Sequence, residues 1–231
     1  MDFVIEPYVR IQNLAKDTMT ELLEFVRPGV TEKDIAAKAK ALLQQKGIKK
    51  FWYYDIAALV LVGPRTILSV SGREYMPTDM AVQEDDLVTI DLSPMDGIYW
   101  GDYARSIYVE GGIAKSEPSK AGLRNGFNLE SSLHNHLVHI AHPDMTAHEL
   151  WVGMNGLIES YAFENLDFKS NLGHSIERDM KQRRYIEEGN ESILKDFGLF
   201  TFEPHIRQKG QNFGFKHENI YYFVENALHL L

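Results

Sequence analysis

The chain contains no cysteine among its 231 residues. This absence excludes disulfide bonds and thiolate ligands, so any bound metal must be held by oxygen atoms and imidazole nitrogens. A protein without disulfides suits the cytoplasm, which is the location that we expect. The first ten residues, MDFVIEPYVR, carry acidic side chains and no apolar core, so they do not resemble a secretory signal.

Long apolar runs and an excess of basic charge are also missing. No stretch of about 18 apolar residues occurs, which argues against a membrane-spanning helix. Lysine and arginine number 24 against 33 aspartate and glutamate residues, and no basic stripe is visible, so we expect neither nucleic acid nor a membrane as a partner. The hydrophobic content of 44% is sufficient for a sizeable core, either in one large domain or in two fused halves.

The stretch Leu87–Val109 predicts a hairpin of two apolar, β-rich strands around a turn. The pair Asp96-Gly97 is a strong turn signal between these strands. With this pair at the centre of the turn, Asp91 is predicted to lie directly opposite Asp102, with about 4.5–5.5 Å between their Cβ atoms. Two facing carboxylates repel each other, so the hairpin predicts a cation or a shared proton between them.

A second hairpin with the same property is predicted near the C-terminus. Its strands are Leu199–Ile206 and Lys216–Val224, joined by a loop that contains glycine and asparagine. Centring this loop between residues 210 and 211 places Glu203 opposite Glu218. Two hairpins with opposed carboxylates, together with one suitably placed histidine, predict a cage for two metal ions.

Helices and shorter strands are predicted along the rest of the chain. The segments Thr31–Asp34 and Thr146–Glu149 are typical of capping boxes at the start of helices. The apolar periodicity predicts helices at 7–26, 31–47, 119–141 and 146–162, strands at 51–62, 67–70 and 171–176, and an irregular loop across the site at 177–195.

A short internal repeat supports the view that the two hairpins are related. The segments Arg27–Ile35 and His142–Leu150 share the pattern Pro-x-(Val/Met)-Thr-x-x-(Asp/Glu)-(Ile/Leu) at an offset of 115 residues. Together with the duplicated carboxylate hairpin, this repeat predicts a single domain, 1–231, made of two related α+β halves at about 1–115 and 116–231. The site is then expected between the halves, where pockets commonly form.

Several motifs resemble those of a known family. DLSPMDGIYWGD, NLGHSIE, FTFEPHI and FKHENIYYF are similar to the ligand motifs of the methionine aminopeptidase, Xaa-Pro aminopeptidase and prolidase superfamily, the pita-bread metallopeptidases, from about Val26 to the C-terminus. The resemblance implies an α+β fold with a curved antiparallel sheet flanked by helices. It also implies two divalent ions, with Mn or Co favoured over Zn or Fe. The five metal ligands that it implies are Asp91, Asp102, His174, Glu203 and Glu218.

The same resemblance implies hydrolysis of the N-terminal peptide bond of a peptide, which is the expected partner. The segments GLFTFEPHI and DGIYWGDYARS favour the Xaa-Pro branch over methionine removal. In this interpretation Asp102 and Glu218 bridge the two ions, and Glu203 takes and returns the proton of the attacking water. A homodimer is compatible with the sequence.

Two histidines that relatives use to hold substrate are absent here, one from Ser71–Pro77 and one from Glu177–Arg184. We expect Tyr75 or His205 to replace the lost hydrogen-bond donors. The absence leaves three other functions open. They are a pita-bread domain that binds peptide or protein without cleaving it, a methionine aminopeptidase-like enzyme, and a hydrolase of a non-peptide amide.

Structural alternatives exist for the individual side chains as well. Asp91 and Asp102 could flank a turn on an exposed edge. Glu203 and Glu218 could form buried ion pairs with Lys216 or Arg207. The remaining helical histidines are predicted to be solvated, namely His134, His136, His139, His142 and His148.

Overall fold

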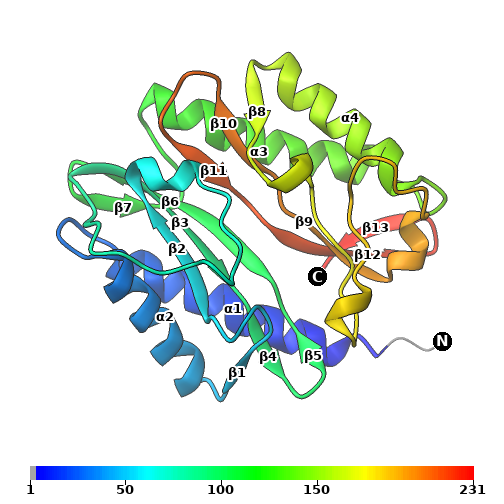
Figure 1. The fold of residues 1–231 in the computed structure, drawn as a ribbon, viewed down its shortest axis with the longest axis horizontal. Coiled ribbons are helices and arrows are strands. Elements are labelled where there is room, and N and C mark those ends of the chain that lie inside the picture. Colours follow the sequence, from blue (N-terminus) through cyan, green and yellow to red (C-terminus); the bar gives the residue numbers. More distant parts are fainter. Residues whose placement is uncertain (1–3) are drawn as a thin grey trace.

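The computed structural model describes residues 4–231 and places antiparallel strands between two pairs of α-helices (Figure 1). Helices α1 and α2 lie along one side, and α3 and α4 lie along the other. The helices are α1 Glu6–Phe25, α2 Glu32–Gln45, α3 Ala121–Ile140 and α4 Ala147–Ser160. Within the described residues, none of the helices has the length and apolar character that crossing a membrane requires.

The strands form four small antiparallel sheets, ordered β2-β3-β6-β7, β1-β4-β5, β11-β10-β8 and β13-β12-β9. This mixture of helices and antiparallel sheets confirms the predicted α+β class. The strands are β1 Lys50–Phe51, β2 Ala58–Val62, β3 Asp85–Leu92, β4 Pro94–Asp96, β5 Tyr99–Trp100, β6 Tyr103–Glu110, β7 Ile113–Lys115, β8 Phe163–Asn165, β9 Leu199–Phe202, β10 His205–Gln208, β11 Gly214–Lys216, β12 Asn219–Val224 and β13 Ala227–Leu230.

Both predicted capping boxes start helices. The Thr31 hydroxyl accepts from the Asp34 amide while the Asp34 carboxylate accepts from the Thr31 amide, and Thr146 with Glu149 repeats this arrangement before α4. Each box pairs free amide groups of the first helical turn, and losing such a cap typically costs about 1 kcal/mol.

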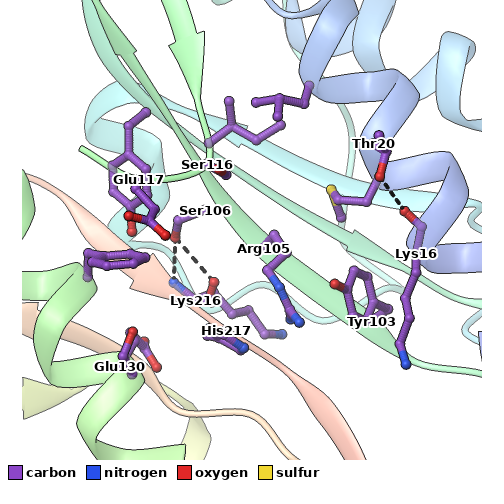
Figure 2. A pocket seen from close by; sticks show the side chains of 16 residues that line it. Lys16, Thr20, Tyr103, Arg105, Ser106, Ser116, Glu117, Glu130, Lys216 and His217 are labelled. Carbon is purple, nitrogen blue, oxygen red and sulfur yellow. Dashed lines mark hydrogen bonds between the residues drawn. The ribbon is translucent and has the colours of Figure 1, made fainter. Parts of the chain in front are cut away.

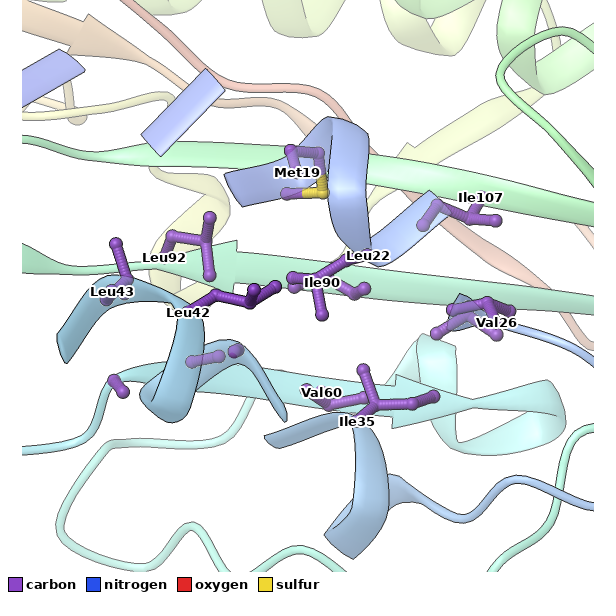
Figure 3. Close-up of a cluster of buried hydrophobic side chains, with 14 of the residues drawn as sticks. Met19, Leu22, Val26, Ile35, Leu42, Leu43, Val60, Ile90, Leu92 and Ile107 are labelled. Carbon is purple, nitrogen blue, oxygen red and sulfur yellow. The ribbon is translucent and has the colours of Figure 1, made fainter. Parts of the chain in front are cut away.

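Two hydrophobic clusters hold the helices against the strands. In the first, the inner faces of α1 and α2 pack on β2, β3 and β6, as Figure 3 shows for Leu22 and Leu42 over Val60 and Ile90. In the second, α3 and α4 pack on β9 and β12 through side chains such as Leu133. Burying each of these side chains contributes roughly 1.5–3 kcal/mol, so each helix pair is firmly attached to its own strands.

The strands under α1 and α2 and the strands under α3 and α4 form two sets, and hydrogen bonds between β6 of the first set and the segment from β11 to β12 of the second, which we call the seam, join them. The Ser106 hydroxyl on β6 accepts from the Lys216 amide and donates to the Lys216 carbonyl, at 2.9 and 3.2 Å. Farther along, the Glu218 amide donates to the Ala104 carbonyl at 3.0 Å. The seam therefore brings β6 beside the segment that carries Glu218.

Four predicted strands differ from those in the structure. Residues 63–67 form a 3-10 turn, for which the fixed φ of Pro64 is suited, and 68–70 have no regular structure, so the strand predicted at 67–70 is absent. Residues 171–176 make only isolated bridges. The two predicted C-terminal strands are each interrupted. The first breaks at Glu203-Pro204, because the Glu203 amide donates to the Leu172 carbonyl and Pro204 has no amide hydrogen. The second breaks at His217-Glu218, because the Glu218 amide donates to the Ala104 carbonyl.

His134 is buried, so its predicted solvation was wrong. It is 6% exposed and lies on the inner face of α3 beside Leu133. Its Nε2–H donates to the His217 carbonyl at 3.0 Å, and its Nδ1 accepts from the Tyr221 hydroxyl at 2.8 Å. Both ring nitrogens are thus bonded in the neutral form, and burial lowers the pKa of His134 to about 3.

We expect His134 to make the fold sensitive to acid. Below about pH 6.5 the unfolded chain binds a proton at this ring while the folded chain does not, so stability falls as the pH decreases toward 3. At pH 5 this one ring costs about 2 kcal/mol. Urea unfolding at pH 7 and pH 5 should therefore show that wild type loses about 2 kcal/mol more than His134→Gln.

The exposed residue His136 on the same helix provides the control for this measurement. His136→Gln should follow the wild-type pH profile. Equal losses of stability in wild type and His134→Gln between pH 7 and pH 5 would contradict the expected role of the buried ring.

Candidate active site

A cavity of about 630 Å³ lies between the two sets of strands. Asp91, Asp102, His174 and Glu203 contribute to its lining. Its remaining wall contains polar and aliphatic side chains and a group of aromatic ones, namely Trp52, Tyr53, Tyr54, Phe168 and Tyr185. This volume lies in the range of about 300–1,000 Å³ that is usual for small-molecule sites.

The first hairpin has a register different from the predicted one. Asp91 pairs with Ala104 and not with Asp102, because the turn centres on Gly97-Ile98. Gly97 has a φ of 64°, which suits the first central position of a two-residue hairpin turn. Asp102 comes directly before β6 and two residues before Ala104, which makes it a diagonal neighbour of Asp91.

The second hairpin has the predicted register. His205 pairs with Lys216 on one side of the break, and Phe202 pairs with Asn219 on the other side. Both ladders continue the same alignment, which places Glu203 across from Glu218 where the strands are interrupted. The carboxylates therefore face each other at the point where both strands leave the ladder.

The structure brings all five predicted ligands together. One carboxylate oxygen each from Asp91, Asp102 and Glu218 lies within 4.8 Å of the other two. The Nε2 atom of His174 is 3.5 Å from Asp102 Oδ2 and 3.6 Å from Glu203 Oε1. Asp102 is thus shared between a group of three carboxylates and a group that contains the histidine, and we call the five side chains the cage.

His174 is held in place by the neighbouring strand β9. The His174 amide donates to the Thr201 hydroxyl at 3.0 Å, and the Thr201 amide donates to the His174 carbonyl at 2.8 Å. Gly173 has a φ of 142°, and a Cβ atom there would overlap the Thr201 carbonyl oxygen. Only glycine fits before His174, and this unusual backbone explains why 171–176 is not a regular strand.

The protonation of His174 suits a metal ligand. Burial lowers the pKa of His174 to about 3, so the ring is neutral. Its Nδ1–H donates to the Ser175 carbonyl at 3.2 Å, which leaves the Nε2 lone pair directed at the carboxylates of Asp102 and Glu203. Such an acceptor on the second ring nitrogen is usual for histidines that bind metals.

The electrostatics of the cage are those of crowded, buried acids. Both oxygens of Glu218 are buried and have no hydrogen-bond partner within the described part of the chain. Burial and the Asp102 charge raise the pKa of Glu218, and burial with the Asp91 and Glu203 charges raises that of Asp102. Burial also raises the pKa of Glu203 to about 7. Oxygen and imidazole donors with unmatched negative charge fit divalent Mn, Co, Zn or Fe.

Tyr75 and His205 line the cavity, but their donors are used elsewhere. The Tyr75 hydroxyl accepts from the Val60 amide at 2.8 Å and donates to the Val60 carbonyl at 3.3 Å. The Nε2–H of His205 donates to the Thr66 carbonyl at 2.7 Å. Each side chain thus has a structural partner for its proton, and the catalytic roles predicted for them stay predictions.

Two cations on the cavity wall were not predicted as site residues. The Nζ atom of Lys216 donates to Asp91 Oδ2 at 2.6 Å and lies 3.3 Å from Glu203 Oε2. The Arg183 guanidinium lies over the rings of Trp52 and Tyr185, at 4.8 and 5.6 Å from their centroids. Lys216 could have been identified from its position two residues before Glu218, because alternate residues of a strand share a face.

The structural alternatives for the acidic ligands are partly realised. The predicted contact between Glu203 and Lys216 is present, whereas Arg207 pairs with Glu164 on β8 at 2.8 Å. Asp102 is buried and does not flank a turn on an exposed edge.

A second cavity of about 390 Å³ lies behind the seam, between α1 and α3 (Figure 2). Arg105 crosses it with its guanidinium 3.9 Å from the Tyr103 ring centroid. Its Nη1 donates to the Glu218 carbonyl at 2.6 Å and its Nη2 donates to Asn219 Oδ1 at 2.7 Å. Arg105 on β6 therefore fixes the backbone of the Glu218 segment from behind the cage.

Comparisons with known proteins show the family of this chain. The family model described as metallopeptidase family M24 matches residues 8–225. The Xaa-Pro dipeptidase of Pyrococcus furiosus is 25% identical over 206 residues, covering 87% of this chain and 54% of the relative. That of Lactobacillus helveticus is 28% identical over 182 residues, covering 78% and 45%. The chain thus spans about half the length of these curated relatives.

Solved structures share the fold over nearly the whole chain. The prolidase from Pyrococcus furiosus has a TM-score of 0.81 at 23% identity, covering 100% of this chain and 64% of that one. The X-Pro aminopeptidase from Thermotoga maritima has a TM-score of 0.80 at 21% identity, covering 98% and 60%. These likenesses confirm the predicted pita-bread fold. Together with the match over residues 8–225, they lead to the conclusion that the chain belongs to metallopeptidase family M24.

Proposed function

We propose that the chain is a peptidase that depends on two divalent metal ions and hydrolyses the N-terminal bond of short peptides, with Xaa-Pro peptides as substrates. The observation that carries this proposal is the cage, in which four carboxylates and one neutral imidazole converge on one cavity. The similarity to Xaa-Pro dipeptidases of Pyrococcus and Lactobacillus supports the choice of substrate.

The ligands divide between two positions in this proposal. Asp91, Asp102 and Glu218 would hold one ion, and His174 with Glu203 would complete the other, with Asp102 and Glu218 shared. Bound divalent ions would polarise the scissile carbonyl and make a water molecule acidic enough to attack it at neutral pH. We favour Mn or Co because four of the five ligands are carboxylates.

The proton of the attacking water passes to Glu203 in this scheme. Glu203 lies at the cavity wall and contacts His174 and Lys216 from its two oxygens. A carboxylate in this position can accept the proton and later return it to the leaving nitrogen. Trp52 and Tyr185 add apolar surface to the wall of the same cavity.

We also propose that the domain consists of two related halves, 1–115 and 116–231. Each half contains a capping box, and each box threonine makes an isolated antiparallel bridge, Thr31 with Ala81 and Thr146 with Ile193. Each half also contributes carboxylates to the cage, so the site lies where the halves meet.

A peptide screen tests the proposed function. The protein is stripped of metal, reloaded with Mn(II) or Co(II), and assayed on matched Xaa-Pro, Met-Xaa and proline-free dipeptides and tripeptides by release of the free N-terminal residue. We expect cleavage of Xaa-Pro substrates in the loaded protein and none in the chelated protein or in Glu218→Gln.

Other outcomes of the screen identify the rival functions. Preferred cleavage of Met-Xaa peptides would replace the Xaa-Pro specificity by methionine removal. A fully loaded protein that cleaves none of the peptides would overturn the peptidase proposal and favour a domain that binds peptides without cleaving them.

A further inference from the structure

Lys216 is the cation that contacts the acids of the cage within residues 4–231. Its Nζ donates to Asp91 at 2.6 Å and lies 3.3 Å from Glu203, which places it between ligands that come from different hairpins. The side chain is 20% exposed and lines the cavity, so a bound molecule can reach it. Two of the four cage carboxylates contact this ammonium group, which therefore supplies a side-chain positive charge directly beside the cage.

The backbone of Lys216 is fixed from two directions. The residue pairs with His205 across β10 and β11, and the Ser106 hydroxyl of β6 bonds both its amide and its carbonyl, as the dashed lines in Figure 2 show. Its side chain therefore starts from a rigid point on the seam. A donor held in this way requires little reorganisation when charge develops beside it.

The ammonium group of Lys216 has one more donor than its contacts use. A lysine ammonium carries three N–H bonds. Asp91 and Glu203 account for two of them, which leaves one for an oxygen that enters the cavity. Tyr75 and His205, by contrast, direct their protons at the backbone of Val60 and Thr66.

We propose that Lys216 stabilises the negative charge that forms on the substrate carbonyl oxygen, in place of the two histidines that this sequence lacks. The inference rests on the proposed peptidase function. Water adds to the carbonyl carbon, its proton passes to Glu203, and the carbonyl electrons become an oxyanion that accepts the third Lys216 N–H. When the C–N bond breaks, the electrons return to the carbonyl and the proton passes to the leaving nitrogen.

The competing explanation is that Lys216 only neutralises Asp91 and Glu203. A group that only neutralises ligands affects metal binding, and it stabilises the ground state and the transition state equally. A group that meets the oxyanion acts on turnover and on the binding of molecules that imitate the tetrahedral state. These two roles therefore predict different measurements.

The test compares Lys216→Gln and Lys216→Arg with wild type, all loaded with saturating Mn(II). Three quantities are measured, namely bound manganese per chain, kcat and KM on an Xaa-Pro peptide, and calorimetric binding of a phosphinic dipeptide analogue that carries a phosphinate at the scissile position. Lys209→Gln provides the control, since Lys209 is an exposed lysine of the same hairpin that pairs with Glu159.

We expect Lys216→Gln to lose about 10²–10³ in kcat, the usual effect of removing one oxyanion donor, with KM changed only a few-fold. Phosphinate binding should weaken by a comparable factor while bound manganese stays the same. Lys216→Arg should recover part of both losses because it keeps the charge, and Lys209→Gln should match wild type.

Two results separate the possible failures. Phosphinate binding and kcat that are equal in Lys216→Gln and wild type at saturating manganese would overturn the role of Lys216, even if the metal affinity falls. A wild-type protein that binds manganese but neither cleaves peptides nor binds the phosphinate would overturn the proposed function itself.

Discussion

Saturating Mn(II) should raise the melting temperature of the wild-type chain by roughly 5–10 °C, and Glu218→Gln should abolish this rise. An ion present at 100 times its dissociation constant stabilises the folded state by about 2.7 kcal/mol, and each kcal/mol shifts the melting temperature of a chain of this size by about 2–4 °C. Glu218 is 0% exposed, and the substitution removes a charge that the ions would neutralise.

The same substitution should have the opposite effect without metal. In the part of the chain that the structure describes, the Glu218 oxygens are buried without a hydrogen-bond partner, and burial and the Asp102 charge raise the pKa of Glu218, so its ionised form is unfavourable without metal. Glutamine removes the charge and can donate to a neighbouring carboxylate, so the chelated variant should melt at or above the chelated wild type. Melting curves recorded with chelator and with Mn(II) measure both effects.

Asp167→Asn is the matched control, because Asp167 lines the same cavity but bonds the Ser69 hydroxyl and lies outside the cage. It should keep the full response to manganese. If the wild-type melting temperature is the same with chelator and with saturating metal, the two-metal proposal is wrong.

Glu203→Gln should reduce turnover by about 10²–10⁴, the usual contribution of a positioned general base. The amide oxygen of glutamine can still bind a metal ion, whereas the amide cannot accept the proton of the attacking water. Manganese binding should therefore remain measurable while kcat falls. Steady-state kinetics and metal analysis on the same preparation check both statements.

Glu187→Gln is the control for this experiment, since Glu187 also lines the cavity but is not a cage residue. Its kcat should stay within a few-fold of the wild-type value. Near-normal turnover in Glu203→Gln would place the general base on another residue.

Local sequence signals predicted the helices and their starts. The capping boxes at Thr31 and Thr146 and the apolar periodicity depend on residues within one or two turns of one another. The second hairpin was predicted with its correct register, whereas the first was not, because the turn at Gly97-Ile98 lies one residue later than the Asp-Gly signal indicates. The fold and family were predicted from the motif resemblance.

The fine structure of the site depends on contacts between distant parts of the chain. The Tyr75 hydroxyl bonds Val60, the His205 ring bonds Thr66 139 residues away, and Lys216 bonds Asp91 125 residues away. No local pattern encodes these pairings. The motif resemblance predicted five ligands that the structure brings to one place, and their role as metal ligands stays a prediction. The hydrogen-bond donors were assigned to Tyr75 and His205, whose protons are engaged with backbone.

The close approach of Gly173 to β9 limits how this protein can change over evolutionary time. Any side chain at position 173 would have to displace the Thr201 carbonyl, and Thr201 in turn bonds the His174 backbone from both its amide and its hydroxyl. A substitution that adds even one methyl group therefore moves a cage ligand without altering any ligand itself. Position 173 is therefore constrained by the space around the backbone and not by any chemistry of its own.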